Sequence, residues 1–101
     1  MLIRFVELNE LTTTREGGRE AKRNFIPVIR AASASNPIIF DFAGVTSISS
    51  SFADEFFGKL INDMGFTDFK AVTTFRNMNP FVSNVIRNSI FHRNSELIGT
   101  T

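Results

Sequence analysis

Cysteine is absent from this chain of 101 residues, and so are tryptophan and tyrosine. Without cysteine the chain has neither a disulfide framework nor a thiolate ligand for a metal. The single histidine, His92, has no serine and aspartate in a recognisable arrangement for a catalytic triad. A chain with one histidine and no cysteine is also a poor candidate for zinc. We therefore expect no enzymatic activity, no bound metal and no cofactor.

An excess of one charge and a long apolar run are lacking as well. Eleven basic and ten acidic residues leave a net charge of +1, so no broad attraction to nucleic acid or to an anionic membrane follows. No apolar run approaches the roughly 18 residues that cross a bilayer. The charged residues near the start do not suit a signal peptide. We expect a cytoplasmic protein with a single domain over residues 1–101 and no nucleic-acid or membrane partner.

The most informative stretch of the chain covers residues 38–64. Ile38, Ile39 and Phe40 form an apolar run, which predicts a buried strand. A polar loop follows, and apolar residues then recur with the spacing of one helix face. These residues are Ala53, Phe56, Phe57, Leu60, Ile61 and Met64. The stretch therefore predicts a strand, a loop and an amphipathic helix in succession.

Further elements are predicted on both sides of this unit. We expect a strand over Leu2–Leu8, a helix capped by a threonine of Thr12–Thr14, a strand over Phe69–Phe75, and a last helix capped by Asn79. Helices between consecutive strands imply right-handed crossovers. The predicted fold class is α/β, with a mainly parallel or mixed sheet of three to four strands and three helices. A short hairpin within Glu7–Thr14 would supply the fourth strand.

Three adjacent serines, Ser49, Ser50 and Ser51, lie where the loop becomes the helix. One interpretation makes them helix caps, because Ser51 followed by Asp54 is similar to a capping box. Another makes one of them a phosphoacceptor. The free N–H groups and the dipole at this end of a helix favour negative charge, so a phosphoryl group would be tolerated there. The residues alone leave both interpretations open.

The same stretch resembles the STAS domain, the fold of bacterial anti-anti-sigma factors, in its STAS-like branch. The STAS signature runs aspartate-apolar-x-glycine-valine, a short gap, an apolar residue, and Asp-Ser-Ser-Gly at the start of a helix. The matching residues here are Asp41, Phe42, Gly44, Val45 and Ile48, followed by Ser49-Ser50-Ser51-Phe52. Ser49 and Phe52 replace the usual aspartate and glycine. Ser50 falls on the position that is phosphorylated in STAS anti-anti-sigma factors, and the resemblance implies the same layered α/β sheet.

This resemblance implies a regulatory module that binds another protein, as an anti-sigma factor antagonist does. The implied phosphoacceptor is Ser50, and the implied partner is a GHKL-type ATPase acting as a kinase, or an anti-sigma-like factor. Two alternatives remain. The helix start could sense an anion or a nucleotide, or the chain could be a structural subunit whose serines only cap the helix.

Further residues receive roles in this hypothesis. Asp41 and Gly44 would shape the loop, and the expected partner-binding residues are Ser49, Ser51, Phe52, Glu55 and Lys59. For Phe52 the alternative is that its ring folds back over the loop and packs on Val45 or Ile48.

The helix after Thr14 carries a basic outer stripe. Its members are Arg15, Arg19, Lys22, Arg23 and Arg30. This stripe is either a solvated face or a surface for an acidic partner.

Overall fold

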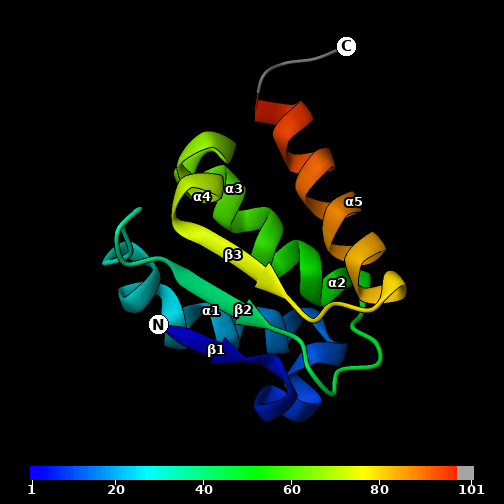
Figure 1. Ribbon diagram of the computed structural model, residues 1–101. Coiled ribbons are helices and arrows are strands. Elements are labelled where there is room, and N and C mark those ends of the chain that lie inside the picture. Colours follow the sequence, from blue (N-terminus) through cyan, green and yellow to red (C-terminus); the bar gives the residue numbers. More distant parts are fainter. Residues whose placement is uncertain (98–101) are drawn as a thin grey trace.

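The fold is built on a sheet of three parallel strands, which the computed structural model shows within the described residues, 1–97 (Figure 1). The strands are β1 (Leu2–Arg4), β2 (Ile38–Asp41) and β3 (Thr73–Arg76), in the spatial order β1-β2-β3. The prediction of an α/β fold with a parallel sheet is confirmed. Residues 98–101, at the end of the predicted domain, lie outside the described part of the chain.

Helical segments connect and follow the strands. They are the 3₁₀ helix η1 (Phe5–Thr13), α1 (Arg15–Arg30), α2 (Ser50–Ala53), the π-helical turn η2 (Asp54–Gly58), α3 (Lys59–Met64), α4 (Phe66–Val72) and α5 (Pro80–Leu97). Segments α2, η2 and α3 follow one another without a break, and we call residues 50–64 the central helix. This helix contacts α1 and α5, so both of its flanks are covered.

The helices cover one face of the sheet. Ile3 and Phe40 are register partners and are both buried, whereas Leu2 and Arg4, which flank Ile3, are exposed. Because successive side chains of a strand point to opposite faces, one face lies in the core and the other is open to solvent. Under the covered face lie seven fully buried phenylalanine rings: Phe5, Phe40, Phe42, Phe52, Phe56, Phe57 and Phe69.

Two predicted helix starts are confirmed by their side-chain caps. Thr14 accepts a hydrogen bond from the Gly17 N–H at 2.9 Å and caps α1. Asn79 accepts one from the Val82 N–H at 2.8 Å and caps α5. Each cap satisfies one of the N–H groups that a helix start leaves without an intrahelical partner.

Two segments differ from the sequence-based expectation. The predicted strand Leu2–Leu8 ends at Arg4, and η1 occupies the place of the expected hairpin. Its first residue, Phe5, stacks on Phe42 in the core, with ring centroids 4.4 Å apart. The third strand starts at Thr73 rather than Phe69. Residues Phe66–Val72 form α4 instead, and the buried side chain of Phe69 enters the core from this helix. In both cases core packing overrides the strand propensity of short apolar segments.

No helix in residues 1–97 combines the length and the apolar character that crossing a membrane would require.

Candidate functional site

The loop after β2 begins with a carboxylate that fixes its backbone. Asp41 Oδ1 accepts hydrogen bonds from the Ala43 N–H at 3.0 Å and from Asn77 Nδ2 at 2.9 Å. The hydrogen bond from Asn77, followed by the one from Ala43, lowers the pKa of Asp41 below its usual value. Asp41 therefore joins the end of β2 to the segment that follows β3.

Two more contacts hold this loop. Gly44 has a φ of +83°, a conformation that glycine adopts without strain. A Cβ on it would also come within 3.2 Å of the Val6 side chain. Farther along the loop, Asn79 Nδ2 donates to the Thr46 carbonyl at 2.9 Å, so the residue that caps α5 also anchors the loop. No pattern in the sequence had assigned this second role to Asn79.

The three serines at the start of the central helix occupy different environments. Ser49 caps the helix, since its Oγ accepts a hydrogen bond from the Phe52 N–H at 3.0 Å, and its own N–H donates to the Thr12 carbonyl at 3.0 Å. The predicted capping box beginning at Ser51 is therefore wrong by two residues. Ser51 is half-buried, whereas Ser50 is exposed and its hydroxyl forms no hydrogen bond to any residue of the described chain.

Phe52 does not lie at a docking surface. Its side chain is fully buried, stacks on Phe56 with centroids 5.8 Å apart, and meets the Phe5 ring edge-on at 6.2 Å. The expectation that Phe52 anchors a partner is corrected by this burial. The central helix is contacted by both α1 and α5, so its apolar surface is wider than one stripe.

Glu55 was also expected to bind a partner, but it does not lie at an exposed edge. It is 3% exposed because α1 covers it. Arg15 Nη1 lies 3.0 Å from Glu55 Oε1, and Lys59 Nζ lies 3.1 Å from Oε2. Burial alone would raise the pKa of Glu55, but the hydrogen bonds from Lys59 and Arg15 outweigh it and the pKa is lowered. Lys59 itself is half-exposed, with its ammonium group held by Glu55.

Close approach of backbones explains this burial. Gly18 of α1 lies against the central helix, and a Cβ on it would come within 2.9 Å of both the Phe52 carbonyl oxygen and the Glu55 Cβ. Only a residue without a side chain allows the two helices to approach so closely.

The basic stripe of α1 finds acidic partners within the same chain. Arg15 pairs with Asp54 and Glu55, and Lys22 Nζ lies 2.6 Å from Asp63 Oδ2. The acidic residues all belong to the central helix. Much of the stripe therefore contacts another helix of the same chain. It is not a purely solvated face, and its paired residues are not free to bind an acidic partner.

Asp54 is the junction of three helices. Arg93 of α5 donates two hydrogen bonds to it, and Arg15 of α1 donates a third at 2.9 Å from Nη1 to Oδ2. The pKa of Asp54 is lowered to about 2, mainly by the hydrogen bonds from Arg93. Burial opposes this shift, and the hydrogen bond from Arg15 adds to it. Sequence reasoning missed this cluster, because Arg15 and Arg93 each lie 39 residues from Asp54 and no local pattern links them.

The turn that carries Asp54 has π-helical rather than α-helical hydrogen bonding. Such turns place an extra residue in the helix and occur often at functional sites. Here the turn ends at Gly58, where a Cβ would come within 2.9 Å of Asp54 Oδ1 and 3.0 Å of Arg93 Cγ. Gly58 thus leaves the space through which Arg93 reaches Asp54.

A small polar cleft adjoins the loop. It has a volume of about 190 Å³ and lies between η1 and the loop, with Thr12, Gly44, Thr46 and Ser47 among its walls. The cleft is at the carboxyl ends of β1 and β2, where open α/β sheets commonly bind ligands.

Comparison with known proteins identifies the family. Residues 21–83 match the family described as STAS-like domain of unknown function (DUF4325), and they include β2, the loop, the central helix and β3. Searches of curated proteins and of solved structures give no match. Arg15 and Arg93, the two partners of Asp54, lie outside the matched residues. The match spans more than half of the chain, and the chain therefore belongs to the family of STAS-like domains of unknown function.

Proposed function

We propose that this protein is a non-enzymatic regulatory module of the anti-sigma factor antagonist type, which binds a protein partner in a manner controlled by phosphorylation of Ser50. One observation carries the proposal. Ser50 is the exposed member of the serine triplet, and its hydroxyl is not engaged by the described chain, whereas the neighbouring Ser49 hydroxyl is occupied as the helix cap. The helix cap and the phosphoacceptor are thus separate residues, and modification of one leaves the other in place.

The proposed modification is chemically simple. The Ser50 Oγ attacks the γ-phosphorus of ATP held by the kinase, the bond from that phosphorus to the β,γ-bridging oxygen breaks, and ADP leaves. The hydroxyl proton passes to a base of the kinase. The product places about two negative charges at the first residue of a helix, where the dipole and the free N–H groups are favourable. The fold therefore tolerates the modification while the surface charge changes.

The proposed docking surface differs from the one expected from the sequence. Phe52 and Glu55 are buried, so the surface consists of the exposed part of the loop and the helix start. Its exposed residues are Ala43, Gly44, Thr46, Ser47 and Ser50. The partner in this proposal is a GHKL-type ATPase acting as a kinase, or an anti-sigma-like factor.

Mass spectrometry of the protein isolated from its own cells tests the phosphorylation step. The proposal expects a phosphopeptide with the phosphate on Ser50, absent from a strain carrying Ser50→Ala and present in a strain carrying Ser47→Ala. Ser47 is a matched control because it is an exposed serine of the same loop. Phosphate on Ser47 but never on Ser50 would contradict the proposal.

A second candidate, the sensing of an anion or nucleotide, is favoured by the polar cleft beside the loop. A ligand that binds only the folded protein raises its midpoint of thermal unfolding. Unfolding measured with ATP, GTP or inorganic phosphate separates the two functions. An increase of several degrees that is lost in Thr46→Val supports the ligand module, and the proposed switch requires no such increase.

A further inference from the structure

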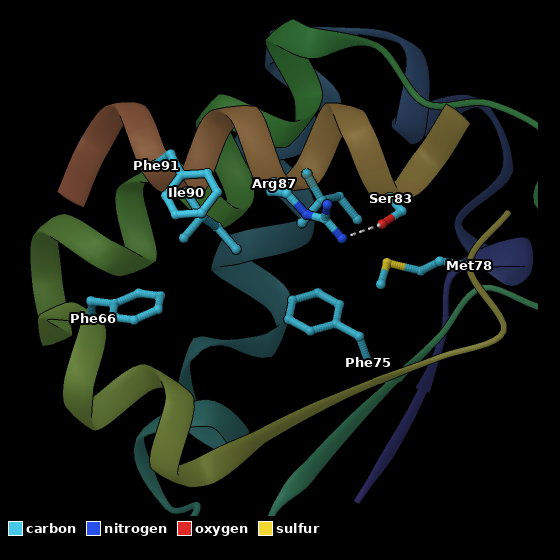
Figure 2. Close-up of a pocket in the computed structure, with 8 residues that line it drawn as sticks. Phe66, Phe75, Met78, Ser83, Arg87, Ile90 and Phe91 are labelled. Atoms are coloured by element: carbon cyan, nitrogen blue, oxygen red, sulfur yellow. Dashed lines mark hydrogen bonds between the residues drawn. The ribbon is translucent and has the colours of Figure 1, made fainter. Parts of the chain in front are cut away.

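A second surface feature is lined by none of the residues of the proposed docking surface and is independent of the proposed switch. A groove of about 210 Å³ runs between α4, β3 and α5. Figure 2 shows Phe66 of α4 and Phe75 of β3 on one side of it, and Ile90 and Phe91 of α5 on the other. Phe91 is 58% exposed, so an aromatic ring at the rim is largely in contact with solvent. Apolar side chains collected in a groove are typical of a surface that binds another molecule.

The groove lies beside an unpaired sheet edge. β3 is the last strand in the order β1-β2-β3, so no strand of the described chain pairs with its outer edge. The Arg76 carbonyl accepts a hydrogen bond from the Phe42 N–H at 2.9 Å, which places the main-chain groups of Arg76 on the side of β2. The main-chain groups of successive residues alternate between the two edges of a strand, so those of Phe75 point outward. An unpaired edge of this kind is a template for another strand.

One charged side chain lines the groove. Arg87 of α5 is exposed, and its Nη2 makes only a long contact of 3.5 Å with the Ser83 hydroxyl (Figure 2). It forms no ion pair with any side chain that the structure describes, unlike Arg15, which has two carboxylates within 3.0 Å. No acidic residue is among the described side chains that line the groove. The groove therefore presents an unneutralised cation next to apolar surface, which is complementary to a carboxylate flanked by apolar groups.

We propose that this groove binds an extended peptide segment of another protein, which adds to β3 as a fourth strand. In this arrangement main-chain groups of the peptide pair with those of Phe75, alternate apolar side chains enter the groove, and an acidic side chain or a terminal carboxylate pairs with Arg87. Strand addition of this kind takes affinity from main-chain hydrogen bonds and specificity from the pockets for alternate side chains.

A phage library of random twelve-residue peptides, panned on the full-length protein, tests the proposal. The wild-type protein should enrich peptides that alternate apolar residues and contain Asp or Glu, and Arg87→Glu should enrich Lys or Arg in their place. Arg23→Glu is the matched control, an exposed arginine of α1 outside this groove, and it should keep the wild-type preference. The best synthetic peptide should bind Arg87→Ala at least about tenfold more weakly than wild type, since a hydrogen bond to a charged group is lost. Identical pools from wild type and Arg87→Glu, or no enrichment, would overturn the proposal.

Two further measurements separate strand addition from other occupants. Hydrogen exchange at the Phe75 amide should slow when the selected peptide binds, and an unchanged exchange rate would overturn strand addition. Sedimentation of the protein without peptide tests the competing occupant, a second copy of the chain. A dimer that dissociates in Arg87→Glu or Phe91→Ala would assign the groove to self-association and overturn the peptide proposal, whereas a monomer supports it.

Discussion

Arg93 and Asp54 form a bidentate ion pair, with Arg93 Nε 2.8 Å from Asp54 Oδ1 and Nη2 2.7 Å from Oδ2. This pair ties α5 to the central helix. Asp54 is the fourth residue after Ser50, so the two share one side of the helix one turn apart. The junction of three helices at Asp54 therefore lies one helical turn from the proposed phosphoacceptor. A negative charge added at Ser50 would interact more strongly with Asp54 and its two arginines than with charged groups farther away.

The stability of the protein should fall with acid because of Asp54. Its pKa in the folded state, about 2, lies below the ordinary value of 3.8, so its contribution is complete above about pH 4 and is lost as the pH falls toward 2. Asp54→Asn should lower the free energy of unfolding by about 2 kcal/mol at pH 7 and flatten its change between pH 4 and pH 2. Urea unfolding at several pH values measures both. Asp68→Asn, a change at an exposed residue of α4, is the control and should keep the pH dependence of wild type. If Asp54→Asn lost stability between pH 4 and pH 2 as steeply as wild type does, Asp54 would not be the group responsible.

Gly58→Ala should lower the free energy of unfolding, as Asp54→Asn does, but through steric crowding rather than loss of a charge. The added methyl group would lie about where Arg93 passes, as its ideal Cβ is 3.0 Å from Arg93 Cγ and 2.9 Å from Asp54 Oδ1. We expect a loss of about 1–3 kcal/mol from overpacking, although alanine favours helices more than glycine does. Chemical denaturation of Gly58→Ala alone and combined with Asp54→Asn measures the coupling. The two losses should be clearly less than additive, because both variants disrupt one ion pair. A stabilised Gly58→Ala protein would contradict the assignment.

Phe52→Ala distinguishes a core residue from a docking residue. Truncation of a fully buried phenylalanine costs about 3–5 kcal/mol. Phe81→Ala is the matched control, since Phe81 is 56% exposed on α5 and its truncation should change the free energy of unfolding by less than about 0.5 kcal/mol. Thermal and urea unfolding of the two variants provide the comparison. Similar small effects for both would place Phe52 at the surface and restore the expectation drawn from the sequence.

Ser49→Ala should cost about 1 kcal/mol, because the cap of the central helix is lost. Ser50→Ala should change stability by less than about 0.5 kcal/mol, since its hydroxyl is exposed and holds no other group of the described chain. Equilibrium unfolding of the two single variants tests the separation of cap from phosphoacceptor. If Ser50→Ala were the more destabilising of the two, Ser50 would be the cap and the separation would be lost.

Local patterns predicted the parts of the fold that depend on local physics. The apolar run Ile38–Phe40 became β2, and the helical spacing from Ala53 to Ile61 became the buried face of the central helix. A threonine cap within Thr12–Thr14 and the cap Asn79 were predicted because a side-chain oxygen at a helix start acts over three residues. The family resemblance rested on the same stretch, and the family match covers it.

The remaining features depend on contacts between distant segments. Phe52 and Glu55 are buried because α1 approaches closely at Gly18, which a wheel drawn on the central helix alone does not show. The pairing of Asp54 with Arg93 joins residues that share no periodic pattern. Residues 69–72 of the predicted strand Phe69–Phe75 belong to helix α4 instead, since packing decides between the two for short apolar segments.

The central claim is that the state of Ser50 controls the binding of a partner, and quantitative affinity capture tests it most directly. Wild type, Ser50→Ala and Ser50→Glu, each tagged and folded, are used as bait in extracts of the protein's own cells, with Ser35→Glu, at an exposed serine outside the proposed docking surface, as the matched control. The account predicts a GHKL-type ATPase or an anti-sigma-like factor retained by wild type, Ser50→Ala and Ser35→Glu but reduced at least about tenfold with Ser50→Glu, because a charge is buried at the interface. Equal recovery of that partner with all four baits would contradict the account.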